Sequence, residues 1–509
     1  MQLFNSLAVA VQTIGVIENV IELDWLGRII QALIEGCGSI GLGIIVFTLI
    51  LKLITLPFDV VSRTSTKKNS VMMEKMRPEL ERLQRQFANN QELYQRKMQE
   101  LYKKNGYSPF SACLPTLLNL VVFIVVIGQF STYSNYANFG IFCKMSVAYE
   151  QAIEQFNDTN EEGLEYVIKV PVKDETGNEI GFHRTLNLVS LYNGAHGAKL
   201  RSFGLELVEN DKYDATLKLP EENQNDVLKA LYDELAKGND GAFFEFVLEG
   251  EQNIIVKNGD NYSFATDNDE EVNKFKTDLG KLLFDFYGGL FINEQIKPVG
   301  RQAAAEEFRS HDLSFLWVKN IWSQDIPWEH PVKENFKDYN FIKKSGCFST
   351  CAAQCNGVDN TISNVTEAQY KELTAGLVDE KSQPNGYLIL VILSIGIMLV
   401  QQVIMQKQQK TQTELGTVDG ANGSAAQSQK MMTWMMPIMF GFFSFMYTAS
   451  FSIYIIVSSL FSLASNFVIN LFVDKHFEKL AKIEAENMEL RRTGRIKEIE
   501  QKQNKKNKK

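Results

Sequence analysis

Two apolar stretches near the start of the chain flank a strongly polar segment. Residues 41–58 read GLGIIVFTLILKLITLPF and carry one charge, Lys52, whereas PFSACLPTLLNLVVFIVVIGQ at 109–129 carries none. A helix of about 20 mostly apolar residues crosses the hydrocarbon core of a bilayer. The pattern therefore predicts transmembrane helices at 39–58 and 108–130 in an integral membrane protein.

Further apolar stretches predict three more transmembrane helices in the C-terminal part of the chain. The first covers residues 386–406. A later apolar run is long enough for two helices joined by a tight turn, at 431–447 and 452–473. The loop at 407–430 is rich in Gln, Gly, Ser and Ala, which is typical of a flexible linker.

The segment at 59–107 is too polar for lipid but has the apolar periodicity of two helices. Asn89 and Asn90 interrupt the pattern, so we expect a helical hairpin with its turn there. The apolar stripes consist of Met72, Met76, Leu80, Leu83 and Phe87 on the first helix and of Tyr94, Met98 and Leu101 on the second. Either these stripes pack against each other, or the methionines offer an adaptable surface to varied partner helices.

Residues 145–311 are polar and acidic, unlike the apolar stretches before them, and their pattern predicts a water-exposed α+β domain. Strand-like alternation and amphipathic helical patterns recur along it, at 165–173, 253–265, 222–236 and 270–290. The pair Asn258-Gly259 is typical of a hairpin turn. The domain shows no nucleophile constellation, phosphate-binding loop or metal-ligand spacing. We therefore expect no enzymatic activity, no catalytic residues, no cofactor and no metal site.

The net charge is −9, and the charges are distributed unevenly along the chain. Residues 145–385 are acidic overall, whereas 58–108 and 475–509 are basic. Segments rich in Lys and Arg remain on the cytoplasmic side of a membrane. We therefore expect the hairpin and the basic tail at 474–509 inside the cell. The α+β domain and the N-terminus are expected outside.

The N-terminal segment at 1–38 contains one amphipathic stretch. Residues 24–34 (DWLGRIIQALI) repeat apolar residues at helical spacing, which predicts a helix lying on the outer membrane surface with Trp25 at headgroup level. The alternative is a plain linker before the first span. Residues 1–23 lack a basic start, so we do not expect a cleaved signal peptide.

The segment at 312–385 is expected outside the membrane and combines aromatic residues with cysteines. Its tryptophans suit the outer membrane interface; they are Trp317, Trp322 and Trp328. Six cysteines in 509 residues are too few for a disulfide framework. Three of them are spaced four apart and would share one helix face, namely Cys347, Cys351 and Cys355. One disulfide or free thiols fit better than a metal site, because a nearby fourth ligand is lacking.

Three motifs resemble the YidC/Oxa/Alb family of membrane protein insertases, in its bacterial YidC form. They are LKLITLP at 51–57, MRPELERLQRQF at 76–87 and LYKKNGYSPFSACLPTLLN at 101–119, and matching stretches recur at 314–327 and 387–466. The acidic insert is not covered. Together with the apolar pattern, the resemblance implies an integral membrane all-α core of five transmembrane helices with a cytoplasmic helical hairpin, plus the inserted extracellular α+β domain.

The resemblance gives Lys52 a role, because the basic residue of the family's substrate groove falls at this position. It is usually arginine there. Lysine keeps the charge but lacks the planar, bidentate guanidinium. Position alone leaves two interpretations open, namely an ammonium that reaches the cytoplasmic water or a cation in a hydrated groove. The resemblance favours the groove.

Polar residues of three predicted spans are candidates for lining this groove. The substrate-groove set is Lys52, Thr116, Asn119, Tyr454, Ser458 and Ser462. Ser459 and Asn466 share the polar face of the last span. Helix packing is the alternative for the serines, and a bond back to its own helix is the alternative for Thr116. The expected partner-binding residues of the hairpin are Met72, Met76, Arg77, Leu80 and Met98.

These observations predict a membrane protein insertase of the bacterial plasma membrane that acts without the Sec translocon or together with it. The expected partners are nascent membrane proteins and the lipid bilayer, with the ribosome and the Sec translocon as further candidates, and no DNA. The alternatives are a transporter or channel, or a membrane-anchored scaffold whose working part is the extracellular insert. The span groups show no internal repeat, which speaks against a transporter.

Overall fold

The computed structural model divides the chain into two compact units, each assembled from separate segments. Unit 1 comprises Met1–Glu22, Tyr136–His311 and Val332–Ser382, and unit 2 comprises Leu23–Asn135, Asp312–Pro331 and Gln383–Lys509. The residues that the structure describes are 16–17, 19, 21–87, 89–106, 110–160, 163–173, 179–211, 214–220, 224–237, 255–334, 361–362, 366–408, 435 and 438–492.

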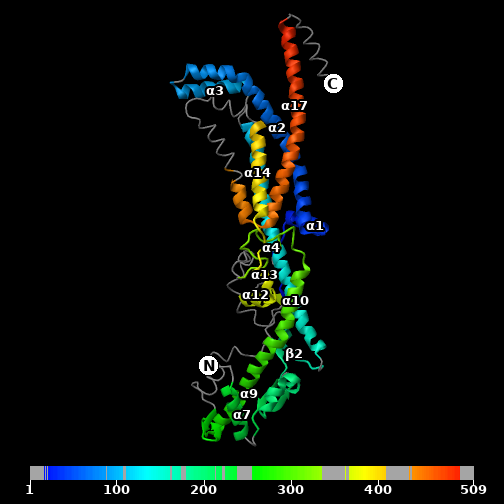
Figure 1. Cartoon of the computed structure of the whole chain (residues 1–509), viewed down its shortest axis with the longest axis vertical. Helices are drawn as coiled ribbons and strands as arrows, with labels where there is room; N and C mark the ends of the chain where they lie inside the picture. The colour runs from blue at the N-terminus through cyan, green and yellow to red at the C-terminus, as the bar shows by residue number, and fades with distance from the viewer. Residues whose placement is uncertain are drawn as a thin grey trace. The chain divides into compact units, whose positions relative to one another are not determined.

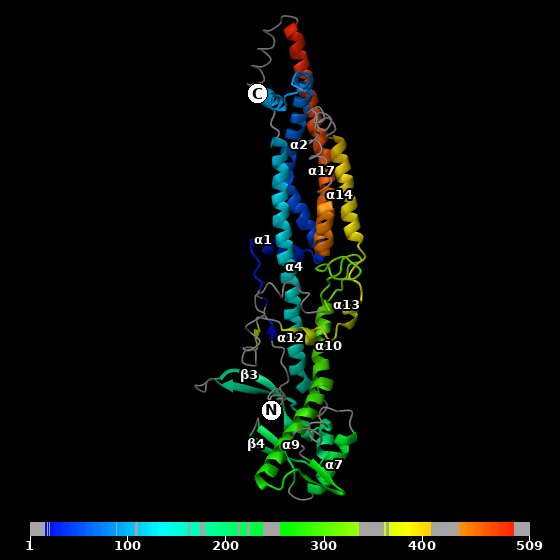
Figure 2. The same ribbon diagram turned by 90° about the vertical axis from the view of Figure 1, so that its left-hand side faces the viewer.

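Unit 2 is built from long helices. They are α1 (Trp25–Gly36), α2 (Ile40–Gln86), α3 (Gln91–Asn105), the first part of α4 (Phe110–Thr159), α14 (Ile389–Gln408), α17 (Ala449–Arg492) and a short helical stretch at 438–446. Helix α17 packs against both α2 and α14, and the three run side by side in Figures 1 and 2. The short helix α1 packs against α2.

Helix α2 continues without a break from the first predicted span into the hairpin. Ser39 precedes it in an extended conformation, and both Pro57 and Pro78 lie within it. A proline inside a helix removes one backbone hydrogen bond but need not end the helix. The end of the span is therefore marked by a change of side chains and not by the end of a helix.

The turn of the hairpin lies where the sequence predicts it. Helix α2 ends at Gln86, and Asn90 caps α3 by accepting a hydrogen bond from the Leu93 amide at 3.0 Å. Gly106 follows α3 with a φ of 67°, a left-handed conformation that favours glycine. The two helices therefore have well-defined ends.

Helix α4 does not end near Gln129, after the second predicted span, but continues to Thr159. Buried residues recur along its second part at helical spacing: Phe142, Met145, Tyr149 and Ile153. No proline interrupts this part of the sequence, so nothing breaks the helix. The boundary that the sequence suggested at residue 145 lies inside a helix.

Unit 1 combines helices with two-stranded hairpins. Antiparallel pairs form between β2 (Val167–Lys173) and β3 (Glu179–Leu186), β4 (Glu206–Asp211) and β5 (Asp214–Lys218), and β6 (Ile255–Asn258) and β7 (Asn261–Phe264). Its helices include α5 (Leu188–Asn193), α6 (Ala198–Ser202), α7 (Gln224–Lys237), α9 (Asp269–Phe291) and α10 (Lys297–Ser310), with a π-helical turn at Ile292–Ile296. Gly259, with a φ of 67°, lies in the turn between β6 and β7.

Unit 1 also takes in segments that the sequence pattern assigned to other regions. Strand β1 (Val16–Ile17) pairs in parallel with β8 (Thr361–Ile362). Helices α12 (Glu367–Leu373) and α13 (Val378–Ser382) belong to unit 1 as well. The sequence pattern predicts separate regions at 1–38, 145–311 and 312–385, whereas unit 1 contains parts of all three. Contacts between distant segments leave no periodicity in the sequence, so the pattern does not reveal this grouping.

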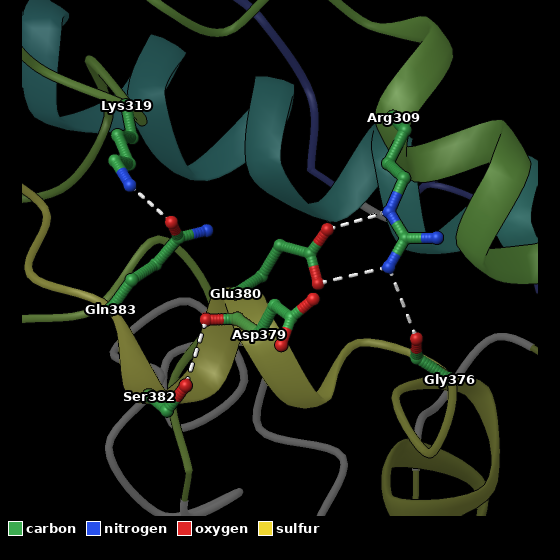
Figure 3. Close-up of polar contacts among 7 residues, drawn as sticks. All are labelled: Arg309, Lys319, Gly376, Asp379, Glu380, Ser382 and Gln383. Carbon is green, nitrogen blue, oxygen red and sulfur yellow. Dashed lines mark hydrogen bonds and ion pairs between the residues drawn. The ribbon is translucent and has the colours of Figure 1, made fainter.

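Two arginine–carboxylate pairs hold α10 to α12 and α13. Arg301 binds both carboxylate oxygens of Glu372, each at 2.8 Å. About two helical turns further along, Arg309 binds Glu380 at 2.6 and 3.2 Å and donates to the Gly376 carbonyl at 3.3 Å (Figure 3). Bidentate geometry adds direction to the charge attraction, so the two pairs fix α12 and α13 on α10.

Part of the interior of unit 1 is polar. Tyr149 of α4 donates a hydrogen bond to Glu372 at 3.0 Å, and its burial together with the nearby carboxylate raises the pKa of its hydroxyl. Arg184 and Glu150 form a second ion pair with both side chains buried. A buried charge that loses its partner is strongly destabilising, so Glu150 depends on Arg184.

Two of the described helices, α2 and α17, are long and apolar enough to cross a membrane, and Ile389–Met405 of α14 is a shorter apolar helix. Large apolar side chains on them are exposed, for example Ile54 at 64% and Phe472 at 71%. Exposed apolar surface on this scale indicates contact with lipid or another apolar partner. The chain is mostly helical and contains candidate membrane helices.

The aromatic residues expected at the outer membrane interface divide into exposed and buried ones. Trp25 on α1 is 71% exposed and Trp328 is 60% exposed. Trp322 is buried and packs edge-on against Tyr133 of α4, with 5.3 Å between ring centroids. Trp322 therefore contributes its ring to the core of unit 2 and does not expose it, and its position at the outer interface stays a prediction.

Candidate functional site

One side of helix α2 carries polar residues through the predicted first span and beyond it. We call this set the polar stripe: Thr48, Lys52, Thr55, Asp59, Arg63, Thr66 and Asn69. These residues recur every three or four positions, as neighbours on one helical face do. All are buried or half-buried, whereas apolar residues between them, such as Leu53 and Ile54, are exposed. This is the reverse of the pattern on a surface helix of a soluble protein.

Two threonines of the stripe satisfy their hydroxyl donors within the helix. Thr48 Oγ1 donates to the Ile44 carbonyl at 2.7 Å, and Thr55 Oγ1 donates to the Lys52 carbonyl at 3.2 Å. Such bonds to the preceding turn are common for threonine in helices. The hydroxyl oxygens can still accept hydrogen bonds, so the stripe offers acceptors as well as cations.

Three charged residues follow one another along the stripe. Asp59 interacts electrostatically with both Lys52 and Arg63. Arg63 Nε also donates to Asn466 Oδ1 of α17 at 2.9 Å. Among these residues, the sequence pattern singled out only Lys52 as a groove cation. Asp59 and Arg63 lie just past residue 58, where the span was expected to end, although helical periodicity across that boundary would have found them.

Helix α17 packs along α2 and contributes further polar residues. Tyr454 is buried between Phe130 and Phe451, at centroid distances of 5.8 and 6.2 Å, and it shares a hydrogen bond with Ser458. Ser458 and Ser462 are half-buried. Tyr454 is therefore positioned by aromatic packing.

Thr116 and Asn119 were expected to lie beside Lys52. Both fall within the backbone of α4, but their side chains lie outside the described residues. Their place in the groove therefore stays a prediction.

Beyond the apolar spans, α2 and α17 remain joined by ion pairs. Lys67 binds Asp474 at 2.7 Å, and Lys75 binds both oxygens of Glu484 at 2.7 and 2.8 Å. The residue numbers rise together on both helices, so the helices run parallel here. All four side chains are substantially exposed, so each pair contributes little energy but helps to fix the register.

The apolar stripes of the hairpin face each other. Met73, Met76, Leu80 and Leu101 form its core, and Met72, Leu83, Met98 and Tyr102 pack around them. Packing within the hairpin, one of the two interpretations of the sequence, accounts for Met76 and Leu80. Arg77 is exposed and pairs with Glu81 at 3.1 Å. Partner binding by this set stays a prediction.

Three serine hydroxyls link three helices in the interior of unit 2. Ser444 Oγ lies 2.9 Å from Ser394 Oγ of α14 and 2.7 Å from Ser452 Oγ of α17. All three residues are buried. Such bonds stabilise contacts between helices in apolar surroundings. No pattern in the sequence indicates this cluster, because single serines in separate spans have no spacing in common.

A buried carboxylate caps the start of α14. Asp325 Oδ1 accepts from the Tyr387 amide at 2.8 Å, and its Oδ2 accepts from the Leu390 amide at 2.7 Å. Trp317 Nε1 also donates to Asp325, at 3.3 Å. A negative charge at a helix N-terminus is favourable, so this contact anchors the start of α14.

Within the described part of the chain, no group of three or more His, Cys, Asp and Glu residues could hold a metal ion. The cysteines at 347, 351 and 355 lie outside the described residues, so their state stays a prediction. Neither Cys37 nor Cys143 forms a disulfide within the described residues.

The sequence profile of the 60Kd inner membrane protein family matches residues 32–157 and 301–476. These residues are more than half of the chain, and they include the polar stripe, the hairpin, α14 and the first part of α17. The chain belongs to this family. The greater part of the acidic insert, residues 158–300, lies between the two matched segments.

Individual relatives align with the chain over shorter stretches. A relative from Fusobacterium nucleatum named "Membrane protein insertase YidC" is 33% identical over 91 residues, which is 18% of this chain and 42% of the relative. Relatives of the same name from Geobacter sp. strain M21 and Clostridium tetani are 34% and 35% identical over 113 and 88 residues. These alignments cover 21% and 17% of this chain and 20% and 38% of the relatives. The chain thus spans less than half of the length of these curated relatives. No solved structure gives a significant match.

Proposed function

We propose that this chain is a membrane protein insertase, which assists the insertion and folding of membrane proteins in the bacterial plasma membrane. The polar stripe is the observation that carries the proposal. It combines shielded hydroxyls and charges with exposed apolar residues on one helix. Such a helix can face lipid on one side and a polar passenger on the other. The name carried by the family's relatives supports the same function.

The proposed mechanism lowers a physical barrier and needs no covalent step. A polar group without a partner in hydrocarbon costs several kilocalories per mole. We infer that the stripe and the polar face of α17 line a hydrated groove that is open to the cytoplasm. The polar tail of an incoming protein would move from the cytoplasm into the groove, while its apolar helix moves directly into lipid. The thickness of hydrocarbon that the tail must cross is then smaller.

Lys52 is the residue we propose as the main contact of the passing tail. It sits within the apolar span, and the hydroxyls of Thr48 and Thr55 on the same face donate to carbonyls of their own helix, so the Lys52 ammonium can attract a carboxylate there. Electrostatic attraction in a groove between apolar helices is stronger than in bulk water. The remaining proposed lining residues are Thr116, Asn119, Tyr454, Ser458 and Ser462.

The proposed topology has five transmembrane helices. The hairpin and the basic C-terminal tail lie in the cytoplasm, and the N-terminus and unit 1 lie outside. The charge partition of the sequence supports this orientation, and the lengths of α2 and α17 support two of the spans. Helix α1, with exposed Trp25, would lie on the outer membrane surface.

The proposed partners are nascent membrane proteins and the lipid bilayer, with the ribosome and the Sec translocon as further candidates. The hairpin and the tail carry the basic residues that could meet ribosomal RNA or anionic lipid. Arg77 is exposed on the hairpin, so it is the most accessible of the residues proposed for partner binding.

Complementation tests the proposed function directly. Cells depleted of their own insertase should regain growth when they produce this chain, and Lys52→Glu should abolish the rescue. Lys371→Glu is the matched control, since Lys371 is an exposed residue of unit 1 outside the spans. A wild-type chain that reaches the membrane and restores neither growth nor insertion would contradict the proposal. Full rescue by Lys52→Glu would instead favour a scaffold whose working part is the insert.

A further inference from the structure

The polar stripe contains a carboxylate between its two cations. Asp59 follows Lys52 by seven residues and precedes Arg63 by four, and α2 is one continuous helix through all three. With 3.6 residues per turn, these spacings place the three side chains on one helical face. All three are half-buried. A negative charge is thus built into the face that is proposed to receive acidic tails.

Both cations already interact with this carboxylate. Asp59 acts electrostatically on Lys52 and on Arg63, and Arg63 is further held by Asn466 of α17. The neighbouring residues Phe58 and Val61 are apolar and exposed, so the charges lie next to a surface of low polarity. Attraction between charges is strengthened in such surroundings. Two positive charges and one negative charge leave the stripe with one net positive charge.

We propose that Asp59 is a specificity-determining residue of the groove, a resident carboxylate that the acidic groups of an incoming tail must displace from Lys52 and Arg63. This inference rests on the proposed insertase function and assigns a substrate class within it. A tail with one acidic residue replaces the Asp59 carboxylate with its own, so its binding gains little energy. A tail with two neighbouring acidic residues can pair with Lys52 and Arg63 at once, so its binding gains more energy.

The alternative is a purely structural role, in which Asp59 only balances the charge of the helix where it leaves the membrane. In that case its loss would lower the amount of folded protein or slow all substrates equally. The proposed role instead changes the ratio between substrates that differ in tail charge. The ratio of insertion rates between these substrates is therefore the quantity to measure, because differences in the amount of active protein cancel in it.

The experiment uses the full chain in proteoliposomes and three single-span substrates with outer tails that differ only in having no, one or two adjacent aspartates. The initial rate of tail protection from protease is measured for each. In the wild-type chain the second aspartate should raise the rate more than the first does. This comparison needs no variant, and a first aspartate that gives the full effect would overturn the inference.

Variants of Asp59 provide the second test. Asp59→Asn should raise the rate for the one-aspartate tail relative to the neutral tail about five-fold, because one competing charge is gone. Asp59→Glu keeps the carboxylate and should behave like the wild type. Glu79→Gln removes a charge from an exposed position of the same helix and should also leave the ratio unchanged. An unchanged ratio in Asp59→Asn, or an equal slowing of all three substrates, would overturn the inference.

Lys52→Ala separates this inference from the proposed function on which it rests. If Lys52→Ala lowers the preference for acidic tails while Asp59→Asn leaves it unchanged, the groove role of Lys52 stands and the role of Asp59 is wrong. If neither variant changes the preference, the proposed groove itself is contradicted. A rise in Asp59→Asn together with a fall in Lys52→Ala supports both.

Discussion

Arg63 of α2 donates a hydrogen bond from Nε to Oδ1 of Asn466 on α17, at a distance of 2.9 Å. The two residues are 403 positions apart in the sequence, and each lies near the end of an apolar span. This contact joins the charged end of the polar stripe to the last membrane helix. It therefore holds together two sides of the proposed groove.

Removing either partner should destabilise the protein. Because the bond involves a charged donor, we expect Asn466→Ala to lower the free energy of unfolding by about 1.5 kcal/mol. Arg63→Ala should have a similar effect, and the double variant should be little worse than either single one. Thermal unfolding in detergent provides the measurement. Fully additive losses would show that the two side chains do not depend on each other.

The sequence anticipated much of the local structure. Hairpin turns follow short-range rules, so the turn at Asn89-Asn90 and the β6–β7 turn beside Gly259 lie where the pattern predicts them. Amphipathic periodicity likewise indicated α7 and α9. These features are encoded by residues that are close neighbours in the chain, which is why they can be recognised without a structure.

Other features depend on contacts between distant segments. The pairing of Arg63 with Asn466 and the cluster of Ser394, Ser444 and Ser452 leave no local pattern. The continuation of α4 to Thr159 has no signal in the sequence, because a change from apolar to polar composition marks the end of a span and not the end of a helix. The charged part of the polar stripe likewise lies past a change of composition, at residue 58, inside the continuous helix α2.

Membrane topology offers a second prediction. Cysteines placed at Asn89, in the hairpin turn, and at Lys274, an exposed position of α9, should be labelled from opposite sides of the membrane in a chain without its native cysteines. The reason is the opposite charge of the two regions. A membrane-impermeant maleimide applied to intact cells should label position 274 and not position 89. Labelling of both positions before lysis would contradict the proposed topology.

The third prediction concerns the Arg301–Glu372 pair. Glu372→Ala would leave Arg301 without its bidentate partner and remove the acceptor of the Tyr149 hydroxyl, so unit 1 should lose about 3 kcal/mol of stability. The exposed pair of Lys371 and Glu367 provides a control, and Lys371→Ala should cost less than about 1 kcal/mol. Limited proteolysis of the insert under increasing denaturant measures both. Equal losses for the two variants would contradict the structural role of Glu372.

The fourth prediction is a pH dependence centred on Asp285, a buried carboxylate of α9. Burial raises its pKa from 3.8 to about 6, although Lys281 opposes the shift. Below about pH 4 the carboxyl is protonated whether the chain is folded or unfolded. Between about pH 4 and pH 6 the unfolded chain releases this proton while the folded chain retains it, so stability falls as the pH rises, by up to about 3 kcal/mol, and the loss is complete above about pH 6.

Asp285→Asn should remove this loss. The variant should unfold at a higher temperature than the wild type at pH 7.5, and the difference should shrink towards pH 4. Asp267→Asn, at an exposed position before the same helix, should show no such trend. A benefit of Asp285→Asn that is the same at both pH values would show that charge burial is not the cause.

Lys52 is proposed to attract acidic groups of the inserting protein. The most direct measurement is the initial insertion rate, in proteoliposomes, for two substrates that differ only in the charge of the outer tail. For the acidic tail, Lys52→Arg should match or exceed the wild type, since a guanidinium adds bidentate geometry to the same charge. Lys52→Ala should be slower, and Lys52→Glu should be slowest. The neutral tail should be nearly indifferent to the Arg and Ala changes. Equal rates for the acidic tail across the Arg, Ala and Glu variants would contradict the account and leave Lys52 as a lysine that merely reaches the membrane surface.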